Sequence, residues 1–303
     1  MNPVERRPSE LKNKHKREAL YQKQKLEKQK AKHKKRKERA KIEEKNPELK
    51  KKRLEENVPK TLDNTREADE TMLDQPDDEV AQDEAMDELA SYFSGKTPKI
   101  LVTTSKKCST NCYDFCAELV SMFPDAQFAK RGPKHELRQV IKIAKEKEFT
   151  DLIVVNEDRK IPNAITLIHL PDGPTAYFKL SSYVPSKAIV NHGKVTAHNP
   201  ELILNNFNTR LGHTVGRMFQ ALLPQVPEFQ GRQVITFHNQ RDFIFVRRHR
   251  YVFRDTEKVG LQELGPRFTL KLRWLQKGVY QRDGEYEWMF KPELETSRKK
   301  FFL

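Results

Sequence analysis

The sequence predicts an α/β (α+β) fold that consists of two similar halves and follows a basic arm. After about residue 96, apolar runs of strand length alternate with stretches whose apolar residues recur at helical spacing. The same order of elements begins again about 102 residues later, at Pro200 after Pro98, which indicates an internal repeat. Residues 1–57 contain almost no large apolar residues, so they have no apolar stripe to bury and cannot form a core.

Charge divides the chain of 303 residues into blocks. Residues 1–60 hold 23 Lys and Arg against 10 Asp and Glu, whereas residues 61–90 hold one Arg against 12 Asp and Glu. We expect residues 1–60 to be a basic arm that is disordered, or helical when bound, and residues 61–95 to be an acidic linker. Residues 96–285 should form the folded domain, with halves at about 96–190 and 198–285, and residues 286–303 should form a C-terminal tail. The net charge of +15 favours a polyanionic partner over charge that only maintains solubility.

The first half is predicted to contain two helices among its strands. Pro124 stops the first helix and Pro133 opens the second. Pro171, Asp172, Gly173 and Pro174 have the composition of a turn between two strands. The expected elements are a strand at 99–104, a helix at 111–123, a strand at 126–130, a helix at 133–147, and strands at 152–155, 165–170 and 175–180.

The second half repeats this order with one omission. Residues 200–206 correspond to 98–104, and the helix before Pro224 corresponds to the helix before Pro124. Residues 234–237 correspond to 152–155, and residues 242–253 correspond to the hairpin at 165–180. The helix at 133–147 has no counterpart, and residues 268–274 add strand material instead. This order predicts two α/β halves packed together.

Several classes of function are disfavoured by what the sequence lacks. Apolar runs such as 152–155 are far shorter than the roughly 20 residues of a membrane span, so we expect no membrane partner. HExxH, phosphate-loop, GxGxxG and GxSxG motifs are absent, so we expect no catalytic residue and no cofactor. Cys108, Cys112 and Cys116 lie four apart without a fourth ligand nearby, which favours small buried residues over a metal site.

Residues 231–282 carry most of the positive charge of the folded region, with 12 Lys and Arg against 4 Asp and Glu. Within them, residues 241–254 fit one strand that is apolar at its ends and basic in its middle. Such a strand can anchor its ends in a sheet while its centre meets phosphate. A tight hairpin with Arg248, His249 and Arg250 at its tip is an alternative, and an ordinary edge strand with a hydrated basic face is another.

Several stretches resemble the Brix domain family, and they cover about residues 96–280. They are KILVTTS with CYDFCAELVSMFP, DLIVVNEDRKIPNAITLIHLPDGPTAYFKLSS, GRQVITFHNQRDFIFVRRHRYVF and GPRFTLKLR. The resemblance implies two similar α/β halves related to the anticodon-binding domains of some tRNA synthetases. It also implies a protein of the nucleus and nucleolus that contacts precursor ribosomal RNA, the pre-ribosomal particle and another nucleolar assembly factor during assembly of the large ribosomal subunit.

The resemblance further implies which residues bind RNA. The family's sigma-like motif corresponds to the region around residues 231–273, and its basic positions here are Arg241, Arg247, Arg248, Arg250, Arg254, Arg267, Lys271 and Arg273. In the arm, the densest basic run includes Lys34, Lys35, Arg36 and Lys37. This run fits a phosphate-binding patch and a nuclear import signal, and a solvated charged helix is the alternative.

Three hypotheses of function follow. The first is a non-enzymatic RNA-binding assembly factor. The second is an RNA-processing enzyme, which would need a carboxylate cluster or a metal near the basic strand, where the sequence places only Asp242 and Asp255. The third is a protein-interaction module whose basic strand meets an acidic partner.

Overall fold

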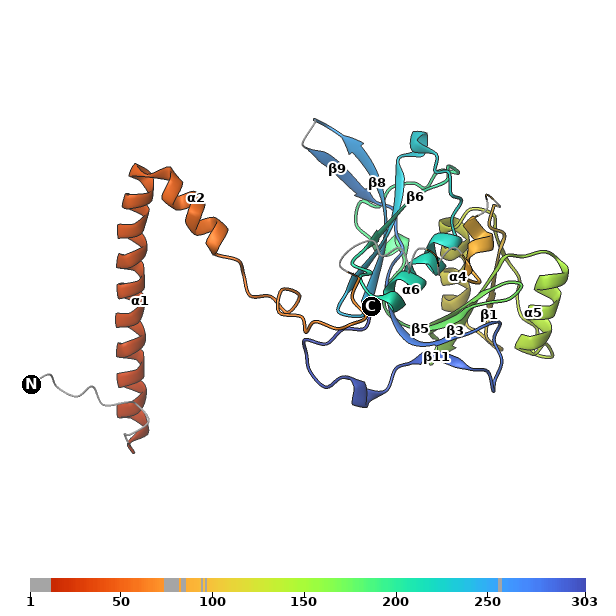
Figure 1. The fold of residues 1–303 in the computed structure, drawn as a ribbon, viewed down its shortest axis with the longest axis horizontal. Coiled ribbons are helices and arrows are strands. Elements are labelled where there is room, and N and C mark those ends of the chain that lie inside the picture. Colours follow the sequence, from red (N-terminus) through yellow and green to blue (C-terminus); the bar gives the residue numbers. More distant parts are fainter. Residues whose placement is uncertain (1–11, 74–81, 83–85, 94, 96, 256–257) are drawn as a thin grey trace, which may run out of the picture. The chain divides into compact units, whose positions relative to one another are not determined.

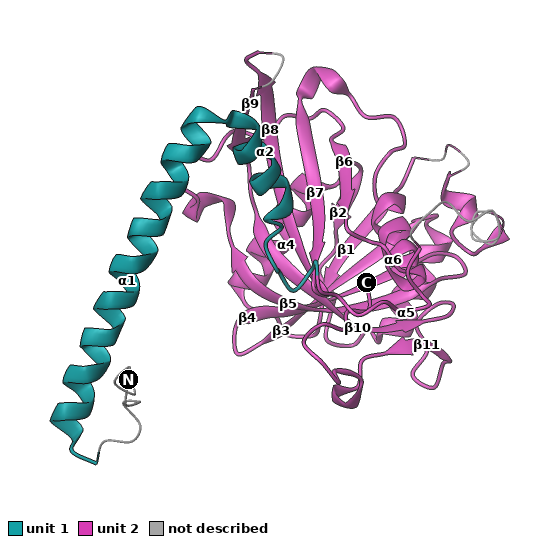
Figure 2. Cartoon of the chain, turned by 60° about the vertical axis from the view of Figure 1, so that its left-hand side comes forward, with its two compact units in different colours: residues 1–64 teal, residues 65–303 magenta. Residues whose placement is uncertain are grey.

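The structure, a computed structural model, describes residues 12–73, 82, 86–93, 95, 97–255 and 258–303 and separates into two units. Unit 1 is Met1–Asn64 and unit 2 is Thr65–Leu303 (Figure 2). The first residues of the predicted arm, and most of the acidic stretch at 74–85, lie outside the described residues.

The basic arm contains two helices, α1 (Lys14–Lys45) and α2 (Pro47–Glu56). Lys, Glu, Gln and Ala favour the helix intrinsically, and the Asn13 side chain caps α1 by accepting a bond from the Lys16 N–H. Arg53 on α2 pairs with Glu43 on α1 at 2.5 Å. Neither helix has a buried residue, so neither contributes to a core, and disorder of the arm without a partner stays a prediction.

Unit 2 is organised around one sheet, which has eleven strands among the described residues (Figure 1). The strand order is β2-β1-β3-β4-β5-β10-β8-β7-β6, with β11 paired to β10 and β9 paired to β8. The strands are β1 (Ile100–Thr104), β2 (Ala126–Phe128), β3 (Asp151–Asp158), β4 (Ile161–His169), β5 (Thr175–Val184), β6 (Glu201–Asn205), β7 (Gln233–Gln240), β8 (Phe243–Phe253), β9 (Val259–Glu263), β10 (Arg267–Gln276) and β11 (Tyr286–Met289).

The sheet consists of two similar halves, which confirms the predicted fold class. In the first half β1 and β3 are parallel, and β3, β4 and β5 are antiparallel neighbours. In the second half β6 and β7 are parallel, and β7, β8 and β10 are antiparallel neighbours. The antiparallel pair of β5 and β10 joins the halves.

One predicted correspondence was wrong. We expected residues 242–253 to match the whole hairpin of the first half and residues 268–274 to be additional. Instead β8 is a single strand that matches β4, and β10 matches β5. The excursion through β9, which pairs only with β8 among the described residues, separates these two strands in sequence and obscured the correspondence.

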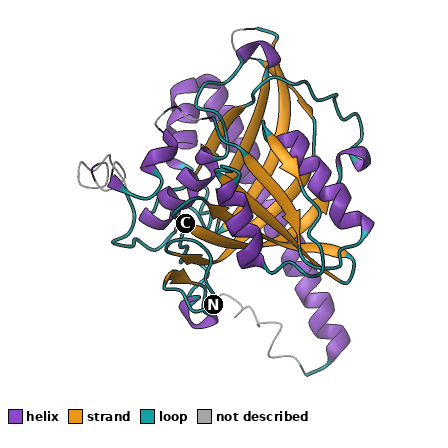
Figure 3. Ribbon diagram, turned by 90° about the vertical axis from the view of Figure 1, so that its right-hand side faces the viewer, coloured by secondary structure: helices purple, strands orange, loops and turns teal. Residues whose placement is uncertain are grey.

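Helices cover both sides of the sheet in unit 2 (Figure 3). α4 (Thr110–Met122) and α6 (Arg210–Ala221) contribute buried side chains such as Phe115 and Phe219 to the larger core. α5 (Leu137–Glu146) packs on the other side with Leu101 and Leu152 in a second, smaller core. α5 begins later than the predicted Pro133 because Glu136 and Gln139 form a capping box there.

Unit 2 also includes residues that we expected to form the acidic linker. The backbone N–H of Glu67 donates to Lys299 O at 3.0 Å, and that of Leu73 donates to Asn208 O at 2.8 Å. Leu89 belongs to the larger core and is buried. The folded unit therefore begins before the predicted residue 96.

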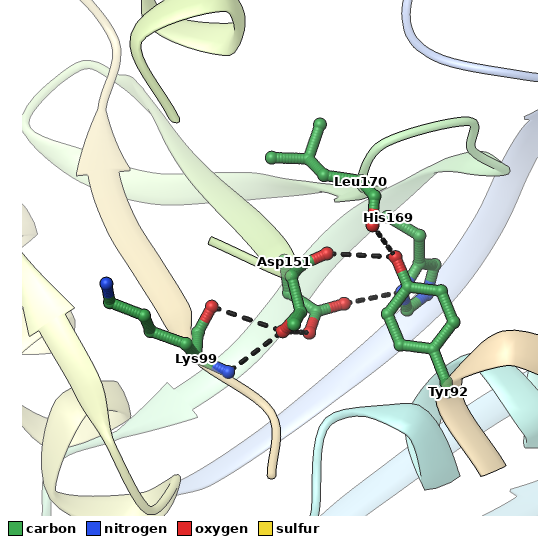
Figure 4. A network of polar contacts seen from close by, with 6 residues as sticks. Tyr92, Lys99, Asp151, His169 and Leu170 are labelled. Atoms are coloured by element: carbon green, nitrogen blue, oxygen red, sulfur yellow. Dashed lines mark hydrogen bonds and ion pairs between the residues drawn. The ribbon is translucent and has the colours of Figure 1, made fainter. Parts of the chain in front are cut away.

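A buried polar network holds the short 3-10 helix at Ala90–Phe93 against the sheet (Figure 4). The Tyr92 hydroxyl donates to Leu170 O and lies 3.0 Å from Thr150 O. Beneath it, His169 Nδ1 lies 2.5 Å from Asp151 Oδ1, and both of these side chains are fully buried. Thr150 Oγ1 lies 2.5 Å from the other oxygen of Asp151, so the carboxylate is held on both sides.

Candidate nucleic-acid interface

One face of the sheet is covered by a helix of unit 2 in its first half alone, as far as the described residues show. In the first half α5 covers this face. In the second half the chain passes from α6 through a 3-10 turn at Phe229–Gly231 directly into β7, so no counterpart of α5 is formed. We call this surface of β5, β7, β8 and β10 the open face. Its side chains are Lys179, Thr236, His238, Gln240, Phe243, Phe245, Arg247, His249, Tyr251, Arg267, Thr269, Lys271 and Arg273.

Alternation along β8 sets which of its side chains reach the open face. Ile244, Val246 and Arg248 are buried toward α4 and α6, whereas Phe245 and Arg247 between them are partly exposed. The prediction of one strand is therefore confirmed, and the alternative of a tight hairpin at residues 248–250 was wrong.

Like charges lie beside one another on the open face. Lys179 on β5 is directly opposite Lys271 on β10, an arrangement that destabilises a sheet unless a counter-charge is present. Arg247 and Arg267 are also neighbours: burial lowers the pKa of Arg247, the charge of Glu263 raises it, and the positive charge of Arg267 lowers it. The open face thus concentrates positive charge that a bound polyanion would complement.

Part of this charge is balanced within the chain. Glu263 forms two bonds of 2.6 Å with the Arg267 guanidinium, and this contact lowers the pKa of Glu263. Lys271 Nζ lies 2.9 Å from Glu295. The ring of Phe290 lies under both Lys271 and Arg273, at 4.6 and 4.7 Å. The C-terminal segment therefore covers part of the basic surface of β10.

Arg248 does not belong to the open face, contrary to our expectation. Its side chain is only 2% exposed. The guanidinium donates to Ser121 O at 2.7 Å and to Gln233 Oε1 at 2.9 Å, and burial lowers its pKa to about 10. Arg248 ties β8 to the end of α4 and has no surface to offer a phosphate.

The other predicted arginines lie apart from this cluster. Arg241 is exposed at the β7–β8 turn, with φ of 55°. Arg250 lies opposite Gln233 on β7 and Gln262 on β9. Arg254 follows the end of β8, where β8 and β9 extend as a hairpin beyond the other strands (Figure 1). Arg254 packs against Gly260 across that hairpin. The structure thus places Arg247, Arg267, Lys271 and Arg273 along the open face and leaves these three outside that group.

The basic run of the arm lies on α1. Lys34, Lys35, Arg36 and Lys37 are exposed, and α1 has no apolar face that would direct them toward a core. They form a cationic surface of unit 1.

Sequence reasoning did not identify Lys179, Phe243 or Phe245 as site residues. Lys179 lies 92 positions from Lys271 in sequence and reaches it only through the pairing of β5 with β10. Phe243 lies under Lys271, with Nζ 5.0 Å from its ring centroid. For Lys179 the pairing partner lies too far along the chain for local periodicity to reveal it.

In the folded chain, Glu157 lies beside two of the cysteines as a third possible metal ligand. The ligand atoms of Cys108, Cys112 and Glu157 lie within 4.8 Å of one another. Burial raises the pKa of Cys108, and the contact with Cys116 together with burial raises that of Cys112, which opposes the thiolate form that a metal requires. Glu157 is already engaged, because it accepts a bond of 2.7 Å from the Ser109 N–H.

No helix in the described part of the chain has the length and apolar character that a membrane crossing requires.

Comparison with known proteins shows which family and which named relatives the chain is similar to. A profile of the Brix domain matches residues 105–274. Ribosome production factor 1 of Saccharomyces cerevisiae is 51% identical over 296 residues, which are 97% of each chain. Ribosome production factor 1 of Mus musculus is 53% identical over 304 residues, covering 97% of this chain and 84% of the mouse protein. A crystal structure of a probable ribosomal biogenesis protein from Aeropyrum pernix K1 matches with a TM-score of 0.45 and 17% identity, over 64% of this chain and 99% of that one.

Proposed function

The chain belongs to the Brix domain family, and from this premise we propose that it is a non-enzymatic ribosome biogenesis factor that binds precursor ribosomal RNA through its open face. The relatives named ribosome production factor 1 support a role in ribosome biogenesis. A place in the nucleus and nucleolus, and action on the large ribosomal subunit with another assembly factor, are parts of the same proposal.

The observation that carries the RNA proposal is the group of like charges on the open face. Strand pairing sets Lys179 opposite Lys271 and brings Arg247 near Arg267, which lies four residues before Lys271 on β10. Phosphate oxygens would neutralise them, and guanidinium groups pair well with phosphate. Phe245 lies beside these cations, opposite Thr269 on β10, and offers surface on which an unstacked base can lie.

A non-catalytic role is supported by the environment of Asp242, one of the two acidic residues near the basic strand. Its Oδ1 accepts bonds from the backbone N–H groups of Phe302 and Leu303, at 2.8 and 2.9 Å. Burial raises the pKa of Asp242, and these two bonds oppose the rise. The carboxylate thus fastens the C-terminal segment to the β7–β8 turn, and we propose no catalytic role for it.

The RNA proposal is tested by titration of single-stranded polyuridylate at several salt concentrations. The variant replaces Lys179, Arg247 and Lys271 with Gln. Each lost phosphate contact should lower the salt slope by about 0.7 for a single strand, so the triple variant should lose roughly 2. The matched control replaces Lys142, Lys145 and Lys194, which are exposed and lie outside the open face. An equal loss of slope in the control, or no loss in the variant, would show that the open face is not the binding surface.

A further inference from the structure

A groove lies far from the open face, where α5 meets the β1–β2 edge of the sheet. Its volume is about 460 Å³. β2 is the last strand on this side among the described residues, so nothing from the described part of the sheet closes the groove beyond it. The lining residues that matter here are the apolar Leu101, Phe128, Val140, Ile143 and Phe149 and the basic Lys99, Lys130, Arg131, His135 and Lys147.

The floor of the groove is apolar and continues to the surface. Leu101 and Phe149 are buried at its base. Phe128 is 41% exposed and Ile143 is 40% exposed at its sides. Large apolar side chains that are exposed next to one another in a concave site indicate an interaction surface.

The rim of the groove is basic, and none of the described residues that line it is Asp or Glu. Two of its groups are fixed in place. Lys99 Nζ donates to Lys147 O at 3.0 Å and lies 4.7 Å from the ring centroid of Phe149. Arg131 Nε donates to His135 O at 2.8 Å. Glu136, just outside the groove, interacts with Arg131, but no carboxylate lines the groove itself among the described residues, so the rim keeps its positive character.

We propose that this groove binds an acidic amphipathic helix of a partner protein. The apolar side chains of such a helix would fill the floor at one-turn intervals, as in other helix-in-groove complexes, and its Asp and Glu side chains would meet the rim. RNA fits less well. Leu101, Val140 and Ile143 present no ring for a base to stack on, and Lys99 covers one face of Phe149. The proposal does not depend on RNA binding at the open face.

The first test is fluorescence anisotropy of the full chain with a synthetic peptide that has Leu at i, i+3, i+4 and i+7 and Glu elsewhere, against a shuffled peptide of the same composition. The ordered peptide should bind at least about tenfold more tightly, because only its apolar side chains share one helical face. Ile143→Asp should weaken binding by at least about tenfold. The combined change of Lys130→Glu and Arg131→Glu should weaken it most at low salt.

Matched controls keep the result interpretable. Ile161→Asp changes an apolar residue that is 61% exposed and lies outside the groove, and Lys142→Glu reverses an exposed charge of α5 outside the groove. Both should bind the peptide as the unaltered chain does. Polyuridylate binding should be unaffected by Ile143→Asp, which separates this proposal from the one above. If Ile143→Asp unfolds the chain, the charge-reversal variant at residues 130 and 131 decides.

The second test uses the chain in isolated pre-ribosomal particles, with a photo-crosslinking residue at position 143. The proposal expects a crosslinked peptide that carries apolar residues at helical spacing among Asp and Glu. A crosslink to RNA, a crosslink to a peptide without this pattern, or no crosslink at all would overturn it. Equal affinity for the ordered and shuffled peptides in the first test would do the same.

Discussion

Arg247 and Arg248 are neighbours in β8 with opposite environments. Arg248 supplies bonds to Ser121 O and Gln233 Oε1 in the interior. Arg248→Ala would leave both acceptors unpaired and should lower the free energy of unfolding by roughly 3 kcal/mol, since each orphaned polar group costs about 1–3 kcal/mol. Arg247 donates to Val246 O at 2.8 Å and Phe268 O at 3.4 Å but is partly exposed, so water can replace it. Arg247→Ala should therefore cost less, about 1 kcal/mol, and should weaken RNA binding. Urea unfolding and RNA titration of both variants separate the two roles, and equal destabilisation would contradict this assignment.

The sequence could not have distinguished these two arginines. Alternation places them on opposite faces of a strand, and that much was predicted correctly. Which face is covered depends on α4 and α6, whose packing is a long-range property. We therefore expected all three of Arg247, Arg248 and Arg250 to be accessible, and this was wrong for Arg248.

His249 should make RNA binding dependent on pH. Burial lowers its pKa below the ordinary 6.5, and the charges of Arg247 and Arg267 lower it further, although Glu263 opposes them. Phosphate at the open face would favour the protonated ring and raise this pKa, so binding would take up a proton. Affinity should be constant well above pH 6.5 and rise as pH falls through the range below it. His249→Gln should remove this rise, and a rise that persists in that variant would assign it elsewhere.

At the scale of the secondary-structure element, Tyr92 links the 3-10 helix at Ala90–Phe93 to the sheet. Its hydroxyl meets Leu170 O and Thr150 O, above the buried pair of Asp151 and His169 (Figure 4). Tyr92→Phe should lower the free energy of unfolding by about 1–3 kcal/mol, because the ring remains but a buried hydroxyl and its bonds are lost. Hydrogen exchange should then be faster at residues 86–93 than in β7. Uniformly faster exchange throughout unit 2 would mean that this segment does not open separately.

Elements with strong local signals were predicted well, and those that depend on distant pairing were not. The run at 152–155 and the helix before Pro124 were located because their apolar residues have the right period. The role of β10 was missed because it comes from pairing with β5. The short 3-10 helix at Ala90–Phe93 was missed because it follows an acidic stretch, although Leu89 before it and Tyr92 within it are buried. The groove beside α5 needs residues from three separate segments, which no local pattern brings together.

At the scale of the whole molecule, the division into two units predicts that the arm contributes to binding but not to folding. α1 and α2 have no buried residues, and residues 1–60 hold 23 Lys and Arg against 10 Asp and Glu. Deletion of residues 1–64 should leave the melting temperature of unit 2 unchanged. The deletion should reduce the salt slope of RNA binding by several units, at about 0.7 for each lost phosphate contact.

A narrower change tests whether the densest basic run accounts for this effect. Replacement of Lys34, Lys35, Arg36 and Lys37 with Gln keeps helix-forming residues on α1 and removes four charges that are exposed. The slope should fall by up to about 3, with the helical circular dichroism signal unchanged. The control replaces Lys12, Lys14, Lys16 and Arg17 with Gln, which removes equal charge where the run is less dense. A smaller loss in the control would locate the phosphate contacts in the dense run, whereas an equal loss would mean that the arm acts as a diffuse cation. A large fall in the melting temperature after the full deletion would instead mean that the arm packs against unit 2.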